Sequence, residues 1–562
     1  MTNEKGFLQP SPAYAGLVRS IISGLALVSL GSLGSLGSLS FGCAHHSGGD
    51  NGDKQDAGIL APDAFAGPYS DFPTEPIVDT SGTTIVPGDV ATQFGGAGTG
   101  AAAGGPCMFE PEIGTIYPRN WIRPRFSWIA GAGESIYELR ITSPSQVNAM
   151  VVYTTSTVWT MPPAIWETLR VHSVSSPLTV TVRGAVSDQT TVTTIAVGST
   201  GDVQIAPVDA PGAIVYWTTT NARLRGFKIG DETVKDIITP SQAATAASST
   251  GAKCIGCHSS TPDGTYVGFS SSQQAGTGDP TMLGLLTTDG ASVAPPFLTP
   301  AAITMMQRLN QEEPVFSKLH WANGDHAAVT MYPVNGKFEM MWTDLEATST
   351  AQGQGWDVIA RTGEANPAAS ASFAHTTDTL LYVSSLHVSS GVSVDHGDLM
   401  TVPYNSHAGG TPTAIDGANT TAYNEYYPTF SPDDTYVAYN RVADGQSSYN
   451  NSQAEVFVVK GAGGAPTRLA ANDPPSCGAR TSPGVTNSWP KWAPGASDVA
   501  GHRYYWLTFS STRGAAGNPQ LYVTPVIDDG ATLRTYPALY LWNQPAAENN
   551  HTPAWDNFGI LE

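Results

Sequence analysis

The sequence predicts an all-β protein, in which a small β-sandwich domain precedes a larger domain of repeated β-units. Glycine and proline account for 59 and 41 of the 562 residues, and both favour turns over helix interiors. Charged residues make up only 13%, about half of the usual ~25%, which leaves little material for exposed helix surfaces. A β-rich motif recurs in the C-terminal part, and only residues 301–309 have the periodicity and length of a helix.

Residues 1–42 are predicted to be a secretory signal peptide. Lys5 and Arg19 precede an apolar run that starts at Ser20 and continues as Gly-Ser-Leu repeats to Leu39. A basic segment, an apolar segment and small residues before a cleavage point are typical of export signals. Glycine and serine dilute the run, so we do not expect a permanent span, which needs ~20 strongly apolar residues.

Gly42-Cys43 resembles the end of a bacterial lipoprotein signal, whose cysteine is acylated and becomes the first mature residue. The leucine usually found three residues before the cysteine is Ser40 here, with Leu39 one place early. The resemblance implies a lipid on Cys43 that anchors the protein to the membrane of the cell envelope. Plain secretion without a lipid is the alternative. Ala44 follows the cysteine, and by resemblance to enterobacterial sorting this implies the outer membrane, facing the periplasm or the cell surface.

Residues 43–104 are predicted to be a lipid-anchored, disordered tether. Beyond the cysteine they are mainly Gly, Ala, Asp, Ser and Thr, with almost no aromatic or periodic apolar content. Such a composition buries too little apolar surface to offset the entropy of the chain. A flexible spacer would suit a domain held away from a membrane by its N-terminal lipid.

Residues 105–205 are predicted to form a small β-sandwich. Apolar and polar side chains alternate, with the period of strands that bury one face, in residues 125–128, 136–141 and 177–182. Several such strands within about 100 residues are typical of a sandwich. Residues 114–118, 124–128 and 137–141 resemble fibronectin type III or immunoglobulin-like modules of bacterial surface proteins. The Cys–Trp–Cys spacing of true immunoglobulin domains is absent.

Residues 206–562 contain six copies of one motif. The clearest copy runs from Phe430 to Tyr439, with the sequence FSPDDTYVAY, and residues 261–269 match it closely. Looser copies begin at Trp321, Phe373, Trp492 and Trp555. With position 260 as the first anchor, successive copies are 61, 52, 57, 62 and 63 residues apart. An aromatic residue, an Asp/Gly turn and a β-rich run, repeated at this length, predict the blades of a propeller.

Over roughly residues 250–562 this motif resembles the TolB-type propeller family, whose repeat reads FSPDG. The resemblance implies a six-bladed, TolB-like β-propeller. The last copy ends seven residues after Trp555, so its blade lacks outer strands. The apolar segments 212–217 and 224–229 are expected to supply those strands and to close the ring.

One motif carries specific chemistry: Cys254-Ile-Gly-Cys257-His258. In Cys-x-x-Cys-His, two thiols attach a haem and the adjacent imidazole binds its iron. By resemblance to c-type cytochromes, Cys254 and Cys257 would hold a covalent haem c, with His258 as the iron ligand. Three alternatives stay open: a structural disulfide or free thiols, a zinc ion, and a degenerate motif that receives no haem. A zinc ion would need two further ligands, which no second Cys-x-x-Cys supplies.

His320 and His551 are the candidates for a second iron ligand. In propellers of this type the residues before each anchor lead into the innermost strand at one mouth of the central channel. His258, His320 and His551 precede the first, second and sixth anchors, and these blades are neighbours in a closed ring. We therefore expect the three imidazoles to converge, with His551 preferred as the metal ligand opposite His258. Solvent exposure is the alternative, and the other histidines are expected at surface or turn positions.

The formal charge of −21 argues against nucleic acid as a partner, because such binding needs clustered Lys and Arg. Two cysteines remain, Cys107 and Cys477, and an oxidising compartment would allow a disulfide between them.

Together these features predict an envelope lipoprotein with covalent haem c on a propeller, for electron transfer or redox-linked binding, with a redox or envelope protein as its partner. One alternative is a non-enzymatic, TolB-like interaction platform whose Cys-x-x-Cys is structural. A second is a propeller hydrolase or oxidoreductase whose site the sequence does not reveal. Whether the protein is an enzyme is left undecided.

Overall fold

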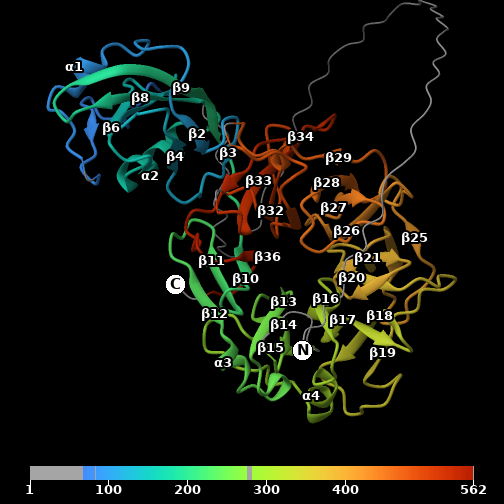
Figure 1. The fold of residues 1–562 in the computed structure, drawn as a ribbon. Coiled ribbons are helices and arrows are strands. Elements are labelled where there is room, and N and C mark those ends of the chain that lie inside the picture. Colours follow the sequence, from blue (N-terminus) through green and yellow to red (C-terminus); the bar gives the residue numbers. More distant parts are fainter. Residues whose placement is uncertain (1–66, 83, 275–280, 477, 515, 561–562) are drawn as a thin grey trace, which may run out of the picture. The chain divides into compact units, whose positions relative to one another are not determined.

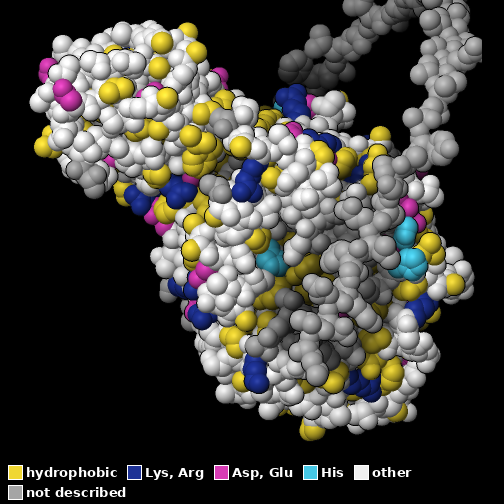
Figure 2. Space-filling view, viewed as in Figure 1, with side chains coloured by type: hydrophobic (Ala, Val, Ile, Leu, Met, Phe, Trp, Pro, Cys, Tyr) yellow, Lys and Arg dark blue, Asp and Glu magenta, His cyan; other side chains and the backbone are white. Residues whose placement is uncertain are grey.

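The computed structural model describes residues 67–560, apart from residues 83, 275–280, 477 and 515, and it is mostly β (Figure 1). The predicted signal peptide, Cys43 and the first part of the predicted tether lie outside these residues. No helix in the described ranges is long and apolar enough to cross a bilayer. Charged side chains are scattered over the face seen in Figure 2, as their low content implies.

The N-terminal part of the described chain contains a six-stranded sheet of order β1-β6-β5-β8-β9-β3 and a three-stranded sheet of order β2-β4-β7. Its elements are β1 (Ile77–Val78), α1 (Val90–Phe94), β2 (Cys107–Glu110), β3 (Ile116–Tyr117), β4 (Arg125–Ile129), β5 (Ile136–Thr142), β6 (Met150–Thr154), β7 (Val158–Thr160), α2 (Pro163–His172), β8 (Leu178–Ser187) and β9 (Val192–Ile205). The predicted strands at 125–128, 136–141 and 177–182 are confirmed as β4, β5 and β8. Their inward side chains, such as Trp128, Leu139 and Val180, are buried in one core.

Helix α2 was not predicted. Pro163 occupies its first turn, where the missing N–H costs nothing, and Trp166 and Leu169 are buried one turn apart on its inner face. Cys107 in β2 is disulfide-bonded, and its predicted partner Cys477 lies outside the described residues.

Ordered structure begins well before the predicted boundary at residue 105. Ile77 and Val78 pair in parallel with β6, and Phe72 and Phe94 are 1% and 0% exposed. The predicted tether therefore does not include residues 67–104. The prediction relied on the average composition of the segment. A few apolar side chains are enough to pack a polar segment against a sheet that other residues form.

In the described residues, six larger antiparallel sheets follow between Ala213 and Asp556, together with one two-stranded sheet of β22 (Val388–Ser390) and β23 (Ser393–Val394). The first combines β10 (Ala213–Thr218), β11 (Arg223–Lys228) and β12 (Lys235–Ile238) with the C-terminal strand β36 (Asn550–Asp556). The second contains β13 (Cys254–Ser260), β14 (Tyr266–Ser272) and β15 (Thr281–Thr287). The third contains β16 (Glu312–Phe316), β17 (Ala327–Val334), β18 (Lys337–Asp344) and β19 (Trp356–Val358).

The remaining three sheets are likewise built from strands that follow one another along the chain. The fourth contains β20 (Ala368–Phe373), β21 (Thr379–Ser385), β24 (Gly397–Pro403) and β25 (Thr413–Ala414). The fifth contains β26 (Tyr423–Phe430), β27 (Tyr436–Ala443), β28 (Glu455–Lys460) and β29 (Thr467–Arg468). The sixth contains β30 (Asn487–Trp492), β31 (Ser497–Val499), β32 (His502–Ser511), β33 (Gln520–Asp528), β34 (Leu533–Thr535) and β35 (Leu539–Tyr540). Short helices α3 (Pro240–Ala243) and α4 (Pro300–Met306) lie in connections, and α4 confirms the helical periodicity predicted around residue 305.

One edge strand of each sheet contacts the corresponding strand of the next sheet. These strands are β13, β16, β20, β26, β30 and β36, and β36 in turn contacts β13. Figure 1 shows the sheets following one another around a common centre. Because β36 pairs with β10, the C-terminal strand completes the sheet that β10–β12 begin, as predicted for residues 212–217 and 224–229. The fold is therefore propeller-like, and we call these six strands the innermost strands.

Two of the predicted repeat anchors are wrong, Trp321 by five residues and position 260 by one. Strand β16 ends at Phe316, whereas Trp321 lies beyond it in a single 3-10 turn and packs its ring on Phe316 at 5.4 Å. With Phe316 in place of Trp321 and Ser259 in place of position 260, positions 259, 316, 373 and 430 are each 57 residues apart. The turn sequence after Trp321 resembled the motif, but the motif's aromatic residue is the one that ends the strand.

Candidate functional site

Every innermost strand has a β-bulge at the same place. Two residues of each strand are left outside the regular pairing with the neighbouring strand. These pairs are Gly256–Cys257, Glu313–Pro314, Ser370–Ala371, Tyr427–Pro428, Trp489–Pro490 and Thr552–Pro553. The first residue of five pairs has a positive φ between 44° and 59°, which costs of order 1–3 kcal/mol for a residue with a side chain. Bulges often occur beside functional sites, because they redirect side chains.

The bulges line one cavity at the centre of the six strands, which we call the channel. Its wall includes Cys257, Glu313, Tyr427 and Trp489, and its volume is about 50 Å³. The rings of Tyr427 and Trp489 stack at 3.6 Å with an angle of 13° between them. The Tyr427 hydroxyl donates to the carbonyl oxygen of Val392 at 2.8 Å, which fixes the stack. This part of the channel is narrow and rigid.

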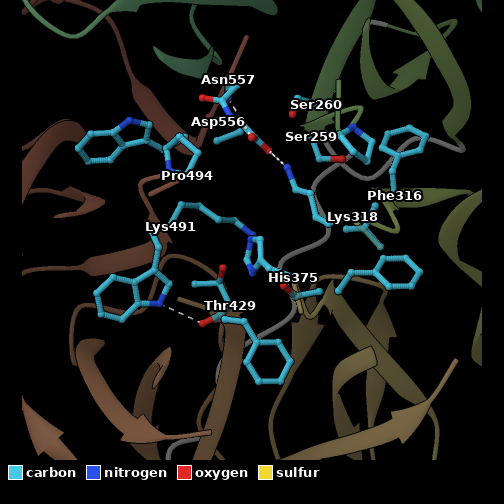
Figure 3. A pocket seen from close by; sticks show the side chains of 18 of the residues that line it. Ser259, Ser260, Phe316, Lys318, His375, Thr429, Lys491, Pro494, Asp556 and Asn557 are labelled. Carbon is cyan, nitrogen blue, oxygen red and sulfur yellow. Dashed lines mark hydrogen bonds and ion pairs between the residues drawn. The ribbon is translucent and has the colours of Figure 1, made fainter. Parts of the chain in front are cut away.

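A larger cavity of about 200 Å³ continues from the channel and shares His258, Val315 and Lys491 with it. We call it the mouth. Figure 3 shows Lys318 reaching across the mouth to the carboxylate of Asp556, with which it forms an ion pair. Neither residue was predicted from the sequence as part of a site.

A histidine–carboxylate pair also lies at the mouth. His375 lines it, and His375 Nδ1 lies 3.2 Å from Asp434 Oδ1. The backbone N–H of His375 also donates to Asp434 at 2.8 Å, so this imidazole is fixed in place. His375 had been expected at a surface or turn position.

Lys491 is the cation that joins the two cavities. It follows the bulge of β30 and lines both the channel and the mouth (Figure 3). No ion pair joins Lys491 to any residue in the described part of the chain, and burial lowers the pKa of its ammonium group. Burial also raises the pKa of Glu313 to about 7, although attraction to Lys491 opposes this. Near neutral pH Glu313 is therefore only partly ionised and does not fully compensate Lys491.

His258 lies in β13 with both ring nitrogens against backbone oxygens. Nε2 is 3.1 Å from the carbonyl oxygen of Val215, and Nδ1 is 3.2 Å from that of Gly256. Burial lowers the pKa of His258 to about 4, so the ring is neutral near pH 7 and donates to only one of the two carbonyls. Cys257 precedes it in the channel wall, and burial together with Glu313 and Glu312 raises the pKa of its thiol.

As placed, the Cys-x-x-Cys-His residues do not fit a covalent haem. Cys254 packs against a hydrophobic cluster beside β13, whereas Cys257 lines the channel, so the two thiols do not face one ligand. Both are thiols rather than a disulfide. Both nitrogens of His258 lie against backbone carbonyl oxygens, which leaves no room for an iron beside either. Cavities of about 50 and 200 Å³ are also smaller than the ~300–1,000 Å³ of typical ligand and cofactor sites. In this arrangement the motif forms part of the channel wall.

The three predicted histidines do not share a register. His258 follows the bulge of its strand, whereas His551 precedes the bulge of β36 and packs against Trp217, with ring centroids 5.0 Å apart and an angle of 53° between the rings. His320 lies beyond the end of β16, with Nε2 2.7 Å from Asp378 Oδ1. The shared register on which the expected convergence of His258, His320 and His551 rested is therefore not present. The prediction rested on Trp321 as an anchor and on unequal distances from the anchors: His258 lies one residue before position 259, whereas His551 lies four residues before Trp555.

The sequence did contain a signal for the residues that were missed. Four innermost strands share the pattern x-Pro-x-aromatic: Glu313–Phe316, Tyr427–Phe430, Trp489–Trp492 and Thr552–Trp555. Aligning them on the proline places Glu313 at the bulge and Lys491 directly after it. The correct anchor, Phe316, would have exposed this alignment.

No protein-family model and no curated protein matches the chain. Similar solved structures include the GH74 enzyme of Niastella koreensis, 11% identical, covering 58% of this chain and 45% of that chain, with a TM-score of 0.33. Kuenenia stuttgartiensis hydrazine synthase is 12% identical, covers 54% and 77%, and has a TM-score of 0.27. A quinoprotein alcohol dehydrogenase-like protein from Bacteroides thetaiotaomicron is 7% identical, covers 80% and 98%, and has a TM-score of 0.27.

The chain spans less than half the length of the GH74 enzyme that it matches. The neighbours include β-propeller-like proteins. Likeness at these TM-scores assigns no activity, substrate or partner to this chain.

Proposed function

We propose that the protein is a non-enzymatic binding platform of the cell envelope, whose channel mouth holds an anionic group of its ligand. The six sheets are taken as the blades of a closed, TolB-like propeller, preceded by an immunoglobulin-like sandwich. The order of contacts among the innermost strands and the pairing of β36 with β10 support this architecture. In propellers and barrels, ligands bind in concave sites at such mouths.

The observation that carries the proposal is Lys491. A buried ammonium group without an ion-pair partner is unfavourable, and a carboxylate of the ligand would offset that cost. Lys318 at the mouth is already paired with Asp556, so the uncompensated positive charge is that of Lys491. In a protein of net charge −21, a local positive site of this kind selects anions.

We favour binding over catalysis because the side chains that could react, Cys257 and His258, are not in a reactive protonation state or orientation. A raised pKa keeps the Cys257 thiol protonated, and the thiolate is the reactive form. His258 contacts the carbonyls of Val215 and Gly256, and neither ring nitrogen faces Cys257 as a base. Neither residue is poised as a nucleophile or a general base in this arrangement.

Calorimetric titration of the purified protein with acetate, succinate and citrate tests the site. We expect at least one of these carboxylates to bind, and Lys491→Met to weaken that binding at least ten-fold. Lys460→Met is the matched control, because Lys460 is an exposed lysine at the end of β28. Flat titrations with all three anions, or equal binding by the Lys491→Met variant, would contradict the proposal.

Attachment through a lipid on Cys43 is part of the same proposal and rests on the sequence alone. We expect Cys43→Ser to abolish palmitate labelling and to release the protein from membranes. Labelled, membrane-bound protein in that variant would exclude Cys43 as the anchor.

A further inference from the structure

Three side chains on one connection direct potential metal ligands toward each other. His387, Asp395 and His396 lie between β21 and β24, in the segment that also forms the short strands β22 (Val388–Ser390) and β23 (Ser393–Val394). His387 Nδ1 is 3.4 Å from Asp395 Oδ1, and His396 Nε2 is 4.0 Å from the same oxygen. All three atoms lie within 4.8 Å of one another, and no other described residues form such a group of three His, Cys, Asp or Glu.

A second carboxylate, from the neighbouring sheet, orients one of the imidazoles. His396 Nδ1 lies 2.7 Å from Oδ1 of Asp444, which follows β27. An N–H donated from Nδ1 to Asp444 leaves the lone pair on Nε2, and Nε2 is the nitrogen nearer to Asp395. Carboxylates that hold an imidazole in this way orient metal-binding histidines and raise their basicity.

Asp395 supplies the second, independent observation. Its Oδ1 is buried and accepts no hydrogen bond, although it lies next to both histidines. An unpaired buried acceptor costs roughly 1–3 kcal/mol, and more when it is charged. The backbone on either side is fixed, because Gly445 donates to the Asp395 carbonyl and Ser448 to the Val394 carbonyl, both at 2.8 Å. The oxygen is thus held in a position that a cation would satisfy.

We propose that His387, Asp395 and His396 bind one divalent transition-metal ion, with Zn²⁺ as the best match. Two imidazole nitrogens and one carboxylate oxygen are a ligand set that Zn²⁺ accepts at about 2.0–2.2 Å. Ligands at that distance in a tetrahedron are about 3.4 Å apart, which is already the separation of His387 and Asp395. The hard ions Ca²⁺ and Mg²⁺ prefer sets made of oxygen alone.

The fourth position of such an ion would face solvent, because the His387 side chain is 71% exposed. A water molecule or a group from a partner would complete it. The ion would also tie the β22–β23 segment to the turn of the next sheet through Asp444. The site is separate from the channel, and the proposal does not depend on the ligand of Lys491.

Zinc titration of the full chain against a chromogenic chelator tests the site. We expect one ion per chain, and at least ten-fold weaker binding by His396→Ala and by Asp395→Asn. Asp444→Asn keeps all three ligands but should still weaken binding about 10–100-fold, an effect that a simple histidine–aspartate pair would not show. His407→Ala is the matched control, since His407 pairs with Asp325 at 2.9 Å but belongs to no three-residue group among the described residues.

Cobalt substitution separates this site from the cysteines. The Co²⁺ spectrum should lack a thiolate-to-metal charge-transfer band, and Cys257→Ser should bind zinc as tightly as the wild type. The proposal is overturned if the wild type binds no zinc, if Cys257→Ser removes binding, or if His396→Ala and Asp395→Asn bind as the wild type does. Circular dichroism confirms that each variant is folded.

Discussion

Strands β13 and β30 occupy equivalent places in the ring and carry the same bulge, yet they fill it differently. In β30 the bulge is Trp489–Pro490, where Trp489 has a φ of +59° and stacks on Tyr427. In β13 the bulge is Gly256–Cys257, so a hydrogen atom and a thiol take the places of the indole and the proline. The same backbone bulge is filled by a packed aromatic ring in β30, whereas in β13 it leaves a thiol facing the channel.

The difference shows that what a Cys-x-x-Cys-His motif can bind depends on the backbone conformation of the strand that carries it. Cys-x-x-Cys-His attaches haem when both thiols and the imidazole can face one ligand. On the bulged strand β13, Cys254 packs beside the strand and Cys257 faces the channel. The directions of the two thiols are then determined by the bulge that all six innermost strands share.

The largest expected effect comes from removing the aromatic ring that fills the bulge of β30. Trp489 is 6% exposed, and Trp489→Ala removes its stack on Tyr427, so the free energy of unfolding should fall by about 3–5 kcal/mol. Urea denaturation followed by circular dichroism measures the change. A loss of less than about 1 kcal/mol would mean that the stack is not what holds this part of the ring.

Cys257→Ala is the matched change in the bulge of β13. It removes one sulfur atom from a wall that already faces a cavity, and the free energy of unfolding should change by less than about 1 kcal/mol. A cost as large as that of Trp489→Ala would show that the two bulges are equally structural.

A pH series sharpens the comparison at β36, where His551 precedes the bulge. Burial lowers the pKa of His551 from 6.5 to about 4, so between these values the unfolded chain binds a proton that the folded chain does not. Stability supplied by the neutral ring is therefore lost as the pH falls through this window, by about 3 kcal/mol. The free energy of unfolding of the wild type, relative to His551→Gln, should drop by that amount between pH 7 and pH 4. A difference that stays constant with pH would mean that His551 is not buried as a neutral ring.

Sequence periodicity was sufficient for the strands and insufficient for the site. Phe373, Phe430, Trp492 and Trp555 lie at the ends of innermost strands, because an aromatic residue there packs between sheets and recurs with the repeat. Periodicity does not show a bulge, which inserts residues without changing the hydrophobic pattern. His258 and His551 were aligned only by both preceding an anchor, although they lie on opposite sides of their bulges.

Lys491 and Glu313 were missed for a related reason. Lys491 is the single charged residue of β30, and Glu313 is one of two adjacent glutamates in β16. Their place in one cavity appears only when the six strands close around them. His387 and His396 were expected at surface positions, and the surface is where they lie. Their approach to Asp395 depends on the path of a connection that no periodic pattern encodes.

The measurement that tests the account most directly is the mass of the protein made in a bacterial host with active cytochrome c maturation. If β13 is a wall of the channel, the purified chain should lack a haem stain and a Soret band. Its mass should carry no haem, and the thiols of Cys254 and Cys257 should react with a maleimide after unfolding. A covalent haem, with those two thiols blocked, would contradict the account and restore electron transfer as the leading function.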